Sequence, residues 1–182
     1  MSIVNAAEIE GVKIIDANVS KDLRGTFLKY SSEKLLSDKL GSIAISINPI
    51  PGTIRGLHFQ IEPYAEEKIV SCIQGSIFEV IVDLRPNSLS FGKFATFNLS
   101  QQDFNQVYLP KGIAHGFQTL SPETIIHYFL TSQYSEKHSY SIDPFDDLNI
   151  KWPIKNHLIS EKDKAGVTLE YAVQKFSESL LD

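Results

Sequence analysis

The stretch KIVSCIQGSIFEVIVDL, residues Lys68–Leu84, decides the fold class. Its two halves, Lys68–Ile73 and Ser76–Leu84, are short runs rich in β-branched and apolar residues, and Gln74–Gly75 between them is typical of a turn. This pattern predicts two neighbouring strands joined by a tight connection. Similar runs recur on both sides of it with turn residues between them, which is typical of a sandwich or a barrel.

The rest of the sequence predicts eight further strands and two short helices. One helix is expected over Ser31–Leu40, where leucines at helical spacing follow a serine and precede Gly41, and the other over about Leu169–Leu181. We therefore predict an all-β protein, a single domain over residues 1–182 that forms an antiparallel barrel or jelly roll and binds a small ligand in its interior. The further strands are expected at Val12–Asp16, Gly25–Tyr30, Ser42–Asn48, Thr53–Gln60, Lys93–Leu99, Gln106–Leu109, His115–Leu120 and Thr124–Leu130.

Composition excludes several classes of protein. The formal net charge of -5 provides no basic field for nucleic acid, so an anionic ligand needs a local cluster of arginine and lysine. The single cysteine, Cys72, lies in an apolar run, which indicates a buried apolar residue and leaves no internal disulfide. The N-terminus lacks a signal-peptide pattern, and no apolar run approaches the ~20 residues of a membrane helix. We expect a cytoplasmic protein without nucleic-acid or membrane partners.

His58 is the first candidate for chemistry. Strand alternation places it on one face with Gly56 and Gln60, and places Arg55, Leu57 and Phe59 on the other. A face that carries histidine and glutamine beside a glycine fits a wet cavity. An outward-facing, solvated histidine fits the same pattern.

Three other polar residues have both a structural and a functional interpretation. Lys68 opens a strand, where a lysine is usually solvated. Tyr128 lies among apolar strand residues, as a core tyrosine with a satisfied hydroxyl does. Asp163 lies in a charged stretch that is typical of a helix cap or a solvated face. None of them identifies a site in isolation.

The segment Pro110–Phe117 is more informative, because Pro-x-Gly-x-x-His resembles the second half-motif of cupin barrels, in which His115 would be a metal ligand. The first half-motif normally supplies His-x-His, and here His58 is followed by phenylalanine and then Gln60. A transition-metal site wants about three histidine or carboxylate ligands. Only His58 and His115 are clear candidates, with Glu66 or Glu67 possible. The sequence therefore predicts a cupin barrel without a metal and without any other cofactor.

Together these segments resemble the dTDP-4-dehydrorhamnose 3,5-epimerase family over about Val12 to Asp163. No single segment is decisive, but nine in the family's order make the resemblance specific. The segments are Asp22–Phe27, Arg55–Gln60, Lys68–Val70 with Gln74–Gly75, Val82–Arg85, Phe91–Gly92, Leu109–Gly112 with Ala114–Phe117, Tyr128, Ile150–Pro153 and Ser160–Asp163.

The resemblance implies a cupin-type double-stranded β-helix and a homodimer in which the N-terminal strand of one subunit lies on the other. It implies that His58 is a general base with Asp163 as its partner. Lys68 is expected near the sugar ketone, and Tyr128 is expected to be the acid on the opposite face of the sugar.

Substrate-binding residues are implied in the same way. Arg55 and Arg24 match positions that grip the diphosphate and the nucleotide, with Arg24 reaching across the dimer, and His115 matches a pocket histidine that contacts the sugar. Phe27, Ser46, Asn48, Gln60 and Tyr134 complete the expected binding site. The sequence departs from the family pattern in the stretch Ala44–Asn48, where a Gln-x-Asn-x-Ser pattern is common, and at Lys29, where an acidic residue is frequent.

The implied activity is cofactor-independent epimerisation of a nucleotide-linked 4-keto-6-deoxy hexose, with dTDP as the expected nucleotide, in deoxysugar and surface polysaccharide biosynthesis. A hydrogen beside a ketone is acidic, so inversion at C3, C5 or both needs a base on one face and an acid on the other. A 3,4-ketoisomerase, a metal-dependent cupin oxygenase or isomerase, and a non-catalytic sugar-nucleotide-binding cupin remain as alternatives.

Overall fold

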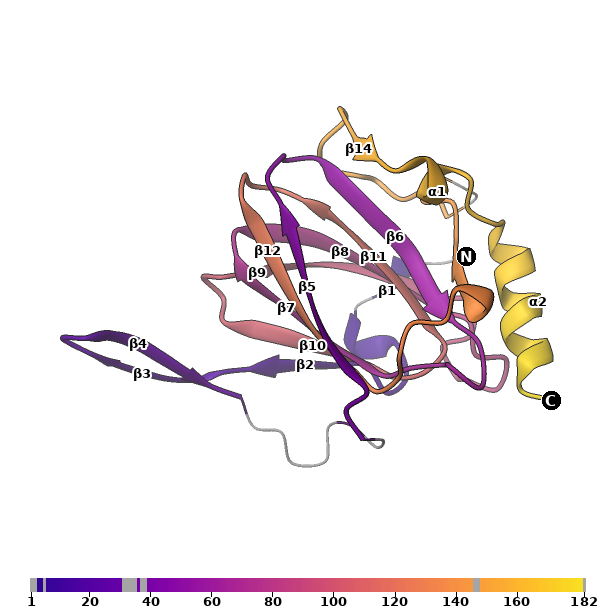
Figure 1. Ribbon diagram of the computed structural model, residues 1–182, viewed down its shortest axis with the longest axis horizontal. Helices are drawn as coiled ribbons and strands as arrows, with labels where there is room; N and C mark the ends of the chain where they lie inside the picture. The colour runs from indigo at the N-terminus through magenta and orange to yellow at the C-terminus, as the bar shows by residue number, and fades with distance from the viewer. Residues whose placement is uncertain (1–2, 5, 31–35, 37–38, 146–147, 182) are drawn as a thin grey trace.

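Two β-sheets pack face to face in the computed structural model, which describes residues 3–4, 6–30, 36, 39–145 and 148–181 (Figure 1). The larger sheet has the strand order β1-β9-β8-β11-β6-β13, with β14 also paired to β6, and the smaller sheet has the order β2-β10-β7-β12-β5. All neighbours are antiparallel except β1 with β9 and β14 with β6. The prediction of an all-β jelly roll is confirmed.

The bounds of the elements follow the chain. The larger sheet comprises β1 (Ile3–Val4), β6 (Thr53–Gln60), β8 (Ser76–Asp83), β9 (Phe94–Ser100), β11 (Ile113–Thr119), β13 (Ser139–Ser141) and β14 (Leu158–Ile159). The smaller sheet comprises β2 (Lys13–Asp16), β5 (Ser42–Asn48), β7 (Lys68–Gln74), β10 (Asn105–Leu109) and β12 (Thr124–Leu130). A separate hairpin is formed by β3 (Asn18–Asp22) and β4 (Gly25–Lys29), and the helices are η1 (Ala6–Glu8), η2 (Glu136–His138), α1 (Glu161–Lys164) and α2 (Leu169–Ser179).

The strands with the clearest alternation were predicted best. β5, β6 and β12 have the predicted bounds, and the other predicted strands differ by one or a few residues at their ends. The sequence did not predict β3, whose five residues NVSKD are all exposed and therefore carry no apolar period. The helix at Leu169 is confirmed, whereas the helix predicted over Ser31–Leu40 lies largely outside the described residues.

The main core lies between the two sheets. The smaller sheet contributes residues such as Val70 and Ile126, and the larger sheet contributes Ile77, Ile81 and Phe117, all of them fully or almost fully buried. Cys72 is buried in the same cluster, as its apolar surroundings predicted. Burial of such side chains is the main stabilising contribution to a fold of this kind.

The outer face of the larger sheet is covered by α2 (Figure 1). The helix begins after Thr168, whose side chain accepts a hydrogen bond from the Tyr171 N–H, and it packs Leu169, Ala172 and Phe176 against the sheet. No helix in the described part of the chain is long and apolar enough to cross a membrane.

A bulge in β6 interrupts the alternation that the sequence predicted for this strand. Opposite β11, His58 pairs with His115 but Arg55 pairs with Phe117, so β6 has one more residue than its partner between these points. Arg55 and His58 therefore line the same cavity, although a regular strand places them on opposite faces. The prediction that Arg55 faces away from His58 was wrong because a bulge shifts the period by one residue.

The bulge depends on two glycines that face each other across the paired strands β6 and β11. Gly56 has a φ of +110°, and a Cβ on it would lie 2.6 Å from the Cα of Gly116. A Cβ on Gly116 would lie 2.6 Å from the carbonyl oxygen of Arg55. Only two glycines allow the backbones to approach in this way.

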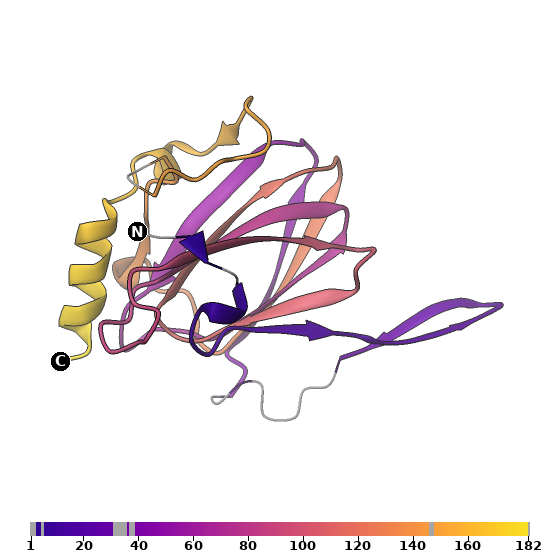
Figure 2. The same ribbon diagram turned by 180° about the vertical axis from the view of Figure 1, so that it is seen from behind.

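The β3–β4 hairpin projects away from the body of the molecule on the side opposite α2 (Figure 2). We call this hairpin, residues 18–29, the arm. Its side chains are largely exposed, including Leu23 and Phe27. The arm therefore has almost no core of its own within one chain.

We expect Gly116→Ala to destabilise the fold, because the added methyl group meets backbone atoms that cannot move independently. The free energy of unfolding should fall by about 1–3 kcal/mol, as overpacking typically causes. Thermal melting followed by circular dichroism measures the change. Asn98→Ala, on an exposed position of the same sheet, is the control and should melt like the wild type. A Gly116→Ala protein with an unchanged melting temperature would contradict the close packing.

Candidate active site

Two adjoining cavities open between the sheets, with volumes of about 270 Å³ and 280 Å³. Three residues line both of them: His58 on β6, Lys68 at the start of β7, and Glu66 just before it. The larger sheet thus supplies the histidine and the smaller sheet the lysine. A basic group, a cation and a carboxylate meet at the boundary between the two spaces.

His58 is paired with Asp163 across 105 residues of sequence. The distance from His58 Nε2 to Asp163 Oδ1 is 2.7 Å, and Asp163 is buried while the imidazole is 39% exposed. Burial alone raises the pKa of Asp163, but hydrogen bonds from His58, the Gly56 N–H and the Ser141 hydroxyl outweigh it and hold the pKa below its ordinary value. Asp163 therefore stays ionised and fixes the orientation of the ring.

The local sequence explains how Asp163 reaches this place. Ser160 caps the one-turn helix α1 by accepting a hydrogen bond from the Asp163 N–H. The helix lies beside β6 and turns Asp163 inward, while its neighbours Glu161 and Lys164 form an exposed ion pair. The interpretation of Asp163 as a cap or a solvated residue was wrong.

Lys68 is buried and not solvated as lysines at strand ends usually are. Its Nζ lies 3.3 Å from Glu66 Oε1, and both side chains are less than one tenth exposed. Because a buried cation needs a partner, Glu66 gives Lys68 a fixed position at the cavity. Glu66 was considered in the sequence only as a possible metal ligand.

Tyr128 and His115 form the floor of the first cavity. Tyr128 comes from β12 in the smaller sheet and His115 from β11 in the larger sheet, and their rings meet edge to face with centroids 6.1 Å apart. Burial raises the pKa of Tyr128, Glu79 raises it further, and Arg55 opposes the shift. The phenol therefore keeps its proton. Tyr128 packs against the core, as the sequence suggested, and also lines the cavity.

Glu79 is a residue that sequence reasoning missed. Its Oε1 lies 2.9 Å from Nδ1 of His115, and the side chain is completely buried. The available signal was its position on β8, where it shares the inward face of the strand with Ile77 and Ile81. A carboxylate on an apolar face is rare unless it has a partner, which here comes from another strand.

Arg55 faces the first cavity and is held by the neighbouring strand β5. Its Nε donates to Asn48 Oδ1 over 2.8 Å, and the Ser46 hydroxyl donates to the same oxygen over 3.2 Å. Ser46 also lines the cavity, whereas Asn48 is buried behind Arg55. The altered stretch before β6 thus positions the arginine.

Gln60 and Tyr134 belong to the second cavity. The Gln60 amide is bonded to backbone groups of Tyr64, Gln133 and Ser135, so it anchors the segment that carries Tyr134. The Tyr134 hydroxyl accepts a hydrogen bond of 3.1 Å from Lys162. Both residues line the cavity, as expected of site residues.

Three predicted substrate-binding residues do not line these cavities within one chain: the buried Asn48, and Arg24 and Phe27 on the arm. Arg24 lies at the tip of the arm, where its side chain is 90% exposed and pairs only with Asp22. Phe27 is exposed on the same arm. Among the described residues, no group of three histidine, cysteine, aspartate or glutamate side chains is arranged to hold a metal ion, and the prediction of a metal-free site stays a prediction.

Comparison with known proteins assigns the chain to a family. The family model for dTDP-4-dehydrorhamnose 3,5-epimerase matches residues 6–171. The chain belongs to this family. A dTDP-4-dehydrorhamnose 3,5-epimerase of Shigella flexneri is 38% identical over 165 residues, covering 87% of this chain and 91% of the relative. The resemblance, the cupin-type fold and the assignment to isomerases are therefore confirmed.

Solved structures agree with the sequence relatives. The enzyme of Bacillus anthracis with TDP and PPi bound superposes with a TM-score of 0.84 at 35% identity, over 91% of this chain and 99% of that one. The enzyme of Legionella pneumophila in complex with dTDP-4-keto-L-rhamnose gives a TM-score of 0.84 at 32% identity, over 91% of this chain and 92% of that one.

We expect Asp163→Asn to lower kcat by about 100- to 10,000-fold, because an uncharged partner no longer favours a proton on His58. The substitution keeps the shape of the side chain, so KM and the melting temperature should change little. Steady-state assays with a 4-keto sugar nucleotide measure both constants. Glu161→Gln, on the same helix turn but exposed, should retain full activity. An Asp163→Asn enzyme with wild-type kcat would exclude the His58–Asp163 pair from proton transfer.

Proposed function

We propose that this protein inverts C3 and C5 of a dTDP-linked 4-keto-6-deoxy hexose by enolate formation and reprotonation, without a metal or a redox cofactor. The observation that carries the proposal is the meeting of His58, Lys68 and Tyr128 around one cavity, with Asp163 behind the histidine. A site that only binds sugar nucleotides does not need a base and an acid on facing sheets. The family and its relatives support a role in deoxysugar biosynthesis, whereas the cytoplasmic location and the link to polysaccharides remain predictions from the sequence.

His58 removes the hydrogen from the carbon beside the ketone. The electron pair of the C–H bond becomes the carbon–carbon double bond of an enolate, and the ketone oxygen takes the negative charge. The imidazolium that forms is stabilised by Asp163 at 2.7 Å. The Lys68 ammonium at the same cavity wall stabilises the enolate oxygen, since a fixed charge in a partly buried site requires little reorganisation.

Tyr128 returns a proton to the same carbon from the opposite face. It belongs to the smaller sheet, whereas His58 belongs to the larger one, so a sugar between them has one group on each side. A carbanion is a much stronger base than a phenolate, so a phenol with a raised pKa still donates to it. The imidazolium then loses its proton and the phenolate regains one through solvent, which restores both groups for the second carbon.

Arg55 fits the diphosphate. A guanidinium binds phosphate oxygens through charge-assisted and often bidentate hydrogen bonds, and Asn48 aims this one at the cavity from behind. The net charge of -5 makes such a local cation necessary for an anionic substrate.

The decisive experiment is incubation with dTDP-4-keto-6-deoxyglucose in deuterated water, followed by NMR. The wild type should invert C3 and C5 and incorporate deuterium at both. His58→Asn should lose inversion and exchange together, because no enolate forms. Tyr128→Phe should still exchange deuterium with retention of configuration while inversion falls by about 100-fold or more.

Two exposed residues provide matched controls for that experiment: His157→Asn and Tyr171→Phe should behave like the wild type. Movement of the ketone to C3 without inversion would identify a 3,4-ketoisomerase instead. Exchange at one carbon alone would restrict the activity to a single epimerisation. Near-normal inversion by Tyr128→Phe would transfer the acid role to Tyr134, which lines the adjoining cavity.

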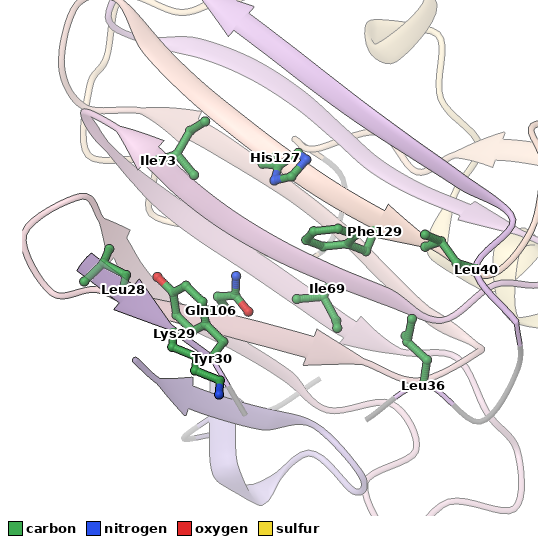
Figure 3. Close-up of a pocket in the computed structure, with 10 residues that line it drawn as sticks. All are labelled: Leu28, Lys29, Tyr30, Leu36, Leu40, Ile69, Ile73, Gln106, His127 and Phe129. Carbon is green, nitrogen blue, oxygen red and sulfur yellow. The ribbon is translucent and has the colours of Figure 1, made fainter. Parts of the chain in front are cut away.

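We also propose that the protein is a homodimer built on the outer face of the smaller sheet. This face carries Ile43, Ile45 and Ile47 on its edge strand β5, each more than half exposed. Beside them a cavity of about 620 Å³, larger than the two described above, lies between the outer face and the base of the arm (Figure 3). It lies away from His58 and is lined mainly by apolar side chains, which favours contact with protein over sugar chemistry. Exposed apolar surface of this kind marks an interface.

A second copy of the chain is the occupant that explains the arm as well. The arm extends far beyond the body of its own subunit and exposes Phe27 and Arg24 without a pocket to enter (Figure 1). In a dimer, the two residues can reach the site of the other subunit, where Arg24 adds a second cation for the diphosphate. An unpartnered two-stranded hairpin is marginal by itself and gains stability on another surface.

We expect Ile43→Asp to convert the dimer to monomers at micromolar concentration, because a charge on the outer face cannot be buried without a partner. Light scattering measures the mass. Leu89→Asp, on an exposed loop between β8 and β9, is the matched control and should remain dimeric. A wild type that is monomeric at this concentration overturns the proposal.

Subunit mixing tests the reach of the arm. Arg24→Ala and Tyr128→Phe should each be weakly active alone. If Arg24 acts in the partner's site, mixed dimers contain one site with both residues intact, and activity should return on mixing. If Arg24 serves only its own subunit, mixing restores nothing.

A further inference from the structure

Glu79 and His115 form a buried ionisable pair at the floor of the first cavity, and the reaction described above gives Glu79 no role. Glu79 on β8 is completely buried and His115 on β11 is 5% exposed. Glu79 Oε1 lies 2.9 Å from His115 Nδ1. Because Nδ1 is engaged by Glu79, Nε2 is the nitrogen that His115 offers to the cavity.

We propose that Glu79 is a neutral carboxylic acid that donates its proton to Nδ1 of His115, so that His115 is a neutral imidazole presenting Nε2–H to the sugar. Glu79 is in this sense a positioning residue, and His115 is the group that touches substrate. The inference deepens the proposed epimerase function and rests on it for the identity of the ligand.

Hydrogen-bond accounting at Glu79 supports the neutral form. Its second oxygen, Oε2, is buried and has no hydrogen-bond partner among the described residues. A carboxylate in this place would leave half of its charge uncompensated, whereas an acid with its hydroxyl directed at Nδ1 leaves only a weaker carbonyl acceptor unpaired. Burial raises the pKa of Glu79 well above its ordinary value, although Lys68 opposes the shift.

The charges around His115 disfavour the alternative, an ion pair of carboxylate and imidazolium. Burial lowers the pKa of His115, and Lys68 and His58 lower it further. Other ionisable groups near the pair are Tyr128, Cys72, Arg55 and Glu66. The tyrosine and the cysteine keep their protons, and Glu66 is paired with Lys68 at 3.3 Å. The positive charges of Lys68 and Arg55 oppose a further positive charge on the imidazole.

A neutral donor suits enolate chemistry. The Nε2–H of a neutral imidazole stabilises negative charge on oxygen but holds its own proton firmly, so the enolate is protonated at carbon and not at oxygen. Neutrality of Glu79 also protects the acid, because an ionised Glu79 raises the pKa of Tyr128. One buried proton thereby keeps two neighbouring groups in their working states.

Spectroscopy of the resting enzyme tests the protonation states without any substrate. Isotope-edited NMR of His115 should report a neutral ring with the proton on Nε2, and infrared difference spectra against Glu79→Gln should contain the stretch of a protonated carboxyl group at neutral pH. An imidazolium, a proton on Nδ1, or the absence of that stretch overturns the inference. These readouts remain valid if the protein proves inactive on 4-keto sugars, so failure of the proposed function is distinguishable.

Steady-state kinetics then tests whether the Glu79–His115 pair contributes to turnover. Glu79→Gln keeps an N–H donor for Nδ1 and should retain most of the deuterium exchange and the Nε2–H tautomer. Glu79→Leu has similar bulk but no donor, and kcat should fall by about 100-fold, the scale of losing one donor to a developing oxyanion. Ile81→Val, two residues along the same inward face, controls for altered packing and should have wild-type kcat. Equal kcat for Glu79→Leu and wild type would show that the pair only fills space.

Discussion

The close approach of Gly56 to Gly116 is the constraint on which the site depends. The contact allows β6 to carry one residue more than β11, and this extra residue turns Arg55 and His58 toward the same cavity. Without it, a regular strand would direct Arg55 and His58 to opposite faces of the larger sheet. The Gly56 N–H also donates to Asp163, so the same position supports the partner of the base. One irregular step in a strand thereby assembles three functional groups.

The interior resolves a conflict between packing and charge. A core formed by two sheets stabilises the fold by excluding water, yet proton transfer needs ionisable groups in that same space. Each such group has a nearby compensating partner: His58 has Asp163, Lys68 has Glu66, and His115 has Glu79. The partners of His58 and His115 come from other elements, so these two pairs also tie β6 to α1 and β11 to β8. The close pairing of these groups offsets the free-energy cost of burying them. The same pairing also restricts the positions that the side chains can take.

The alternating strands were predictable from sequence because burial on one face imposes a period of two residues. β5 and β12 largely follow this period, and β6 follows it except at its bulge. The bounds of all three agree with prediction, whereas the exposed β3 has no apolar period and was missed. The family resemblance selected His58, Lys68, Tyr128 and Asp163 as catalytic candidates, but local patterns alone favoured structural roles for them. Glu66 and Glu79 were not identified as site residues, since the role of Glu79 follows from a partner in another strand and that of Glu66 from the burial of the neighbouring Lys68. Such pairings are set by register and by the bulge, which a single sequence does not encode in any local pattern.

The 105 residues that separate His58 from Asp163 have a consequence for how the enzyme is made. Translation produces every strand of both sheets, β14 included, before it reaches α1, so His58 is synthesised well before the carboxylate with which it pairs. A nascent chain, or one cut between β13 and α1, holds a histidine without its partner. Competence to deprotonate a sugar is therefore acquired late in synthesis, when the last part of the chain docks against β6. The position of one aspartate makes activity depend on a segment that is synthesised after both sheets.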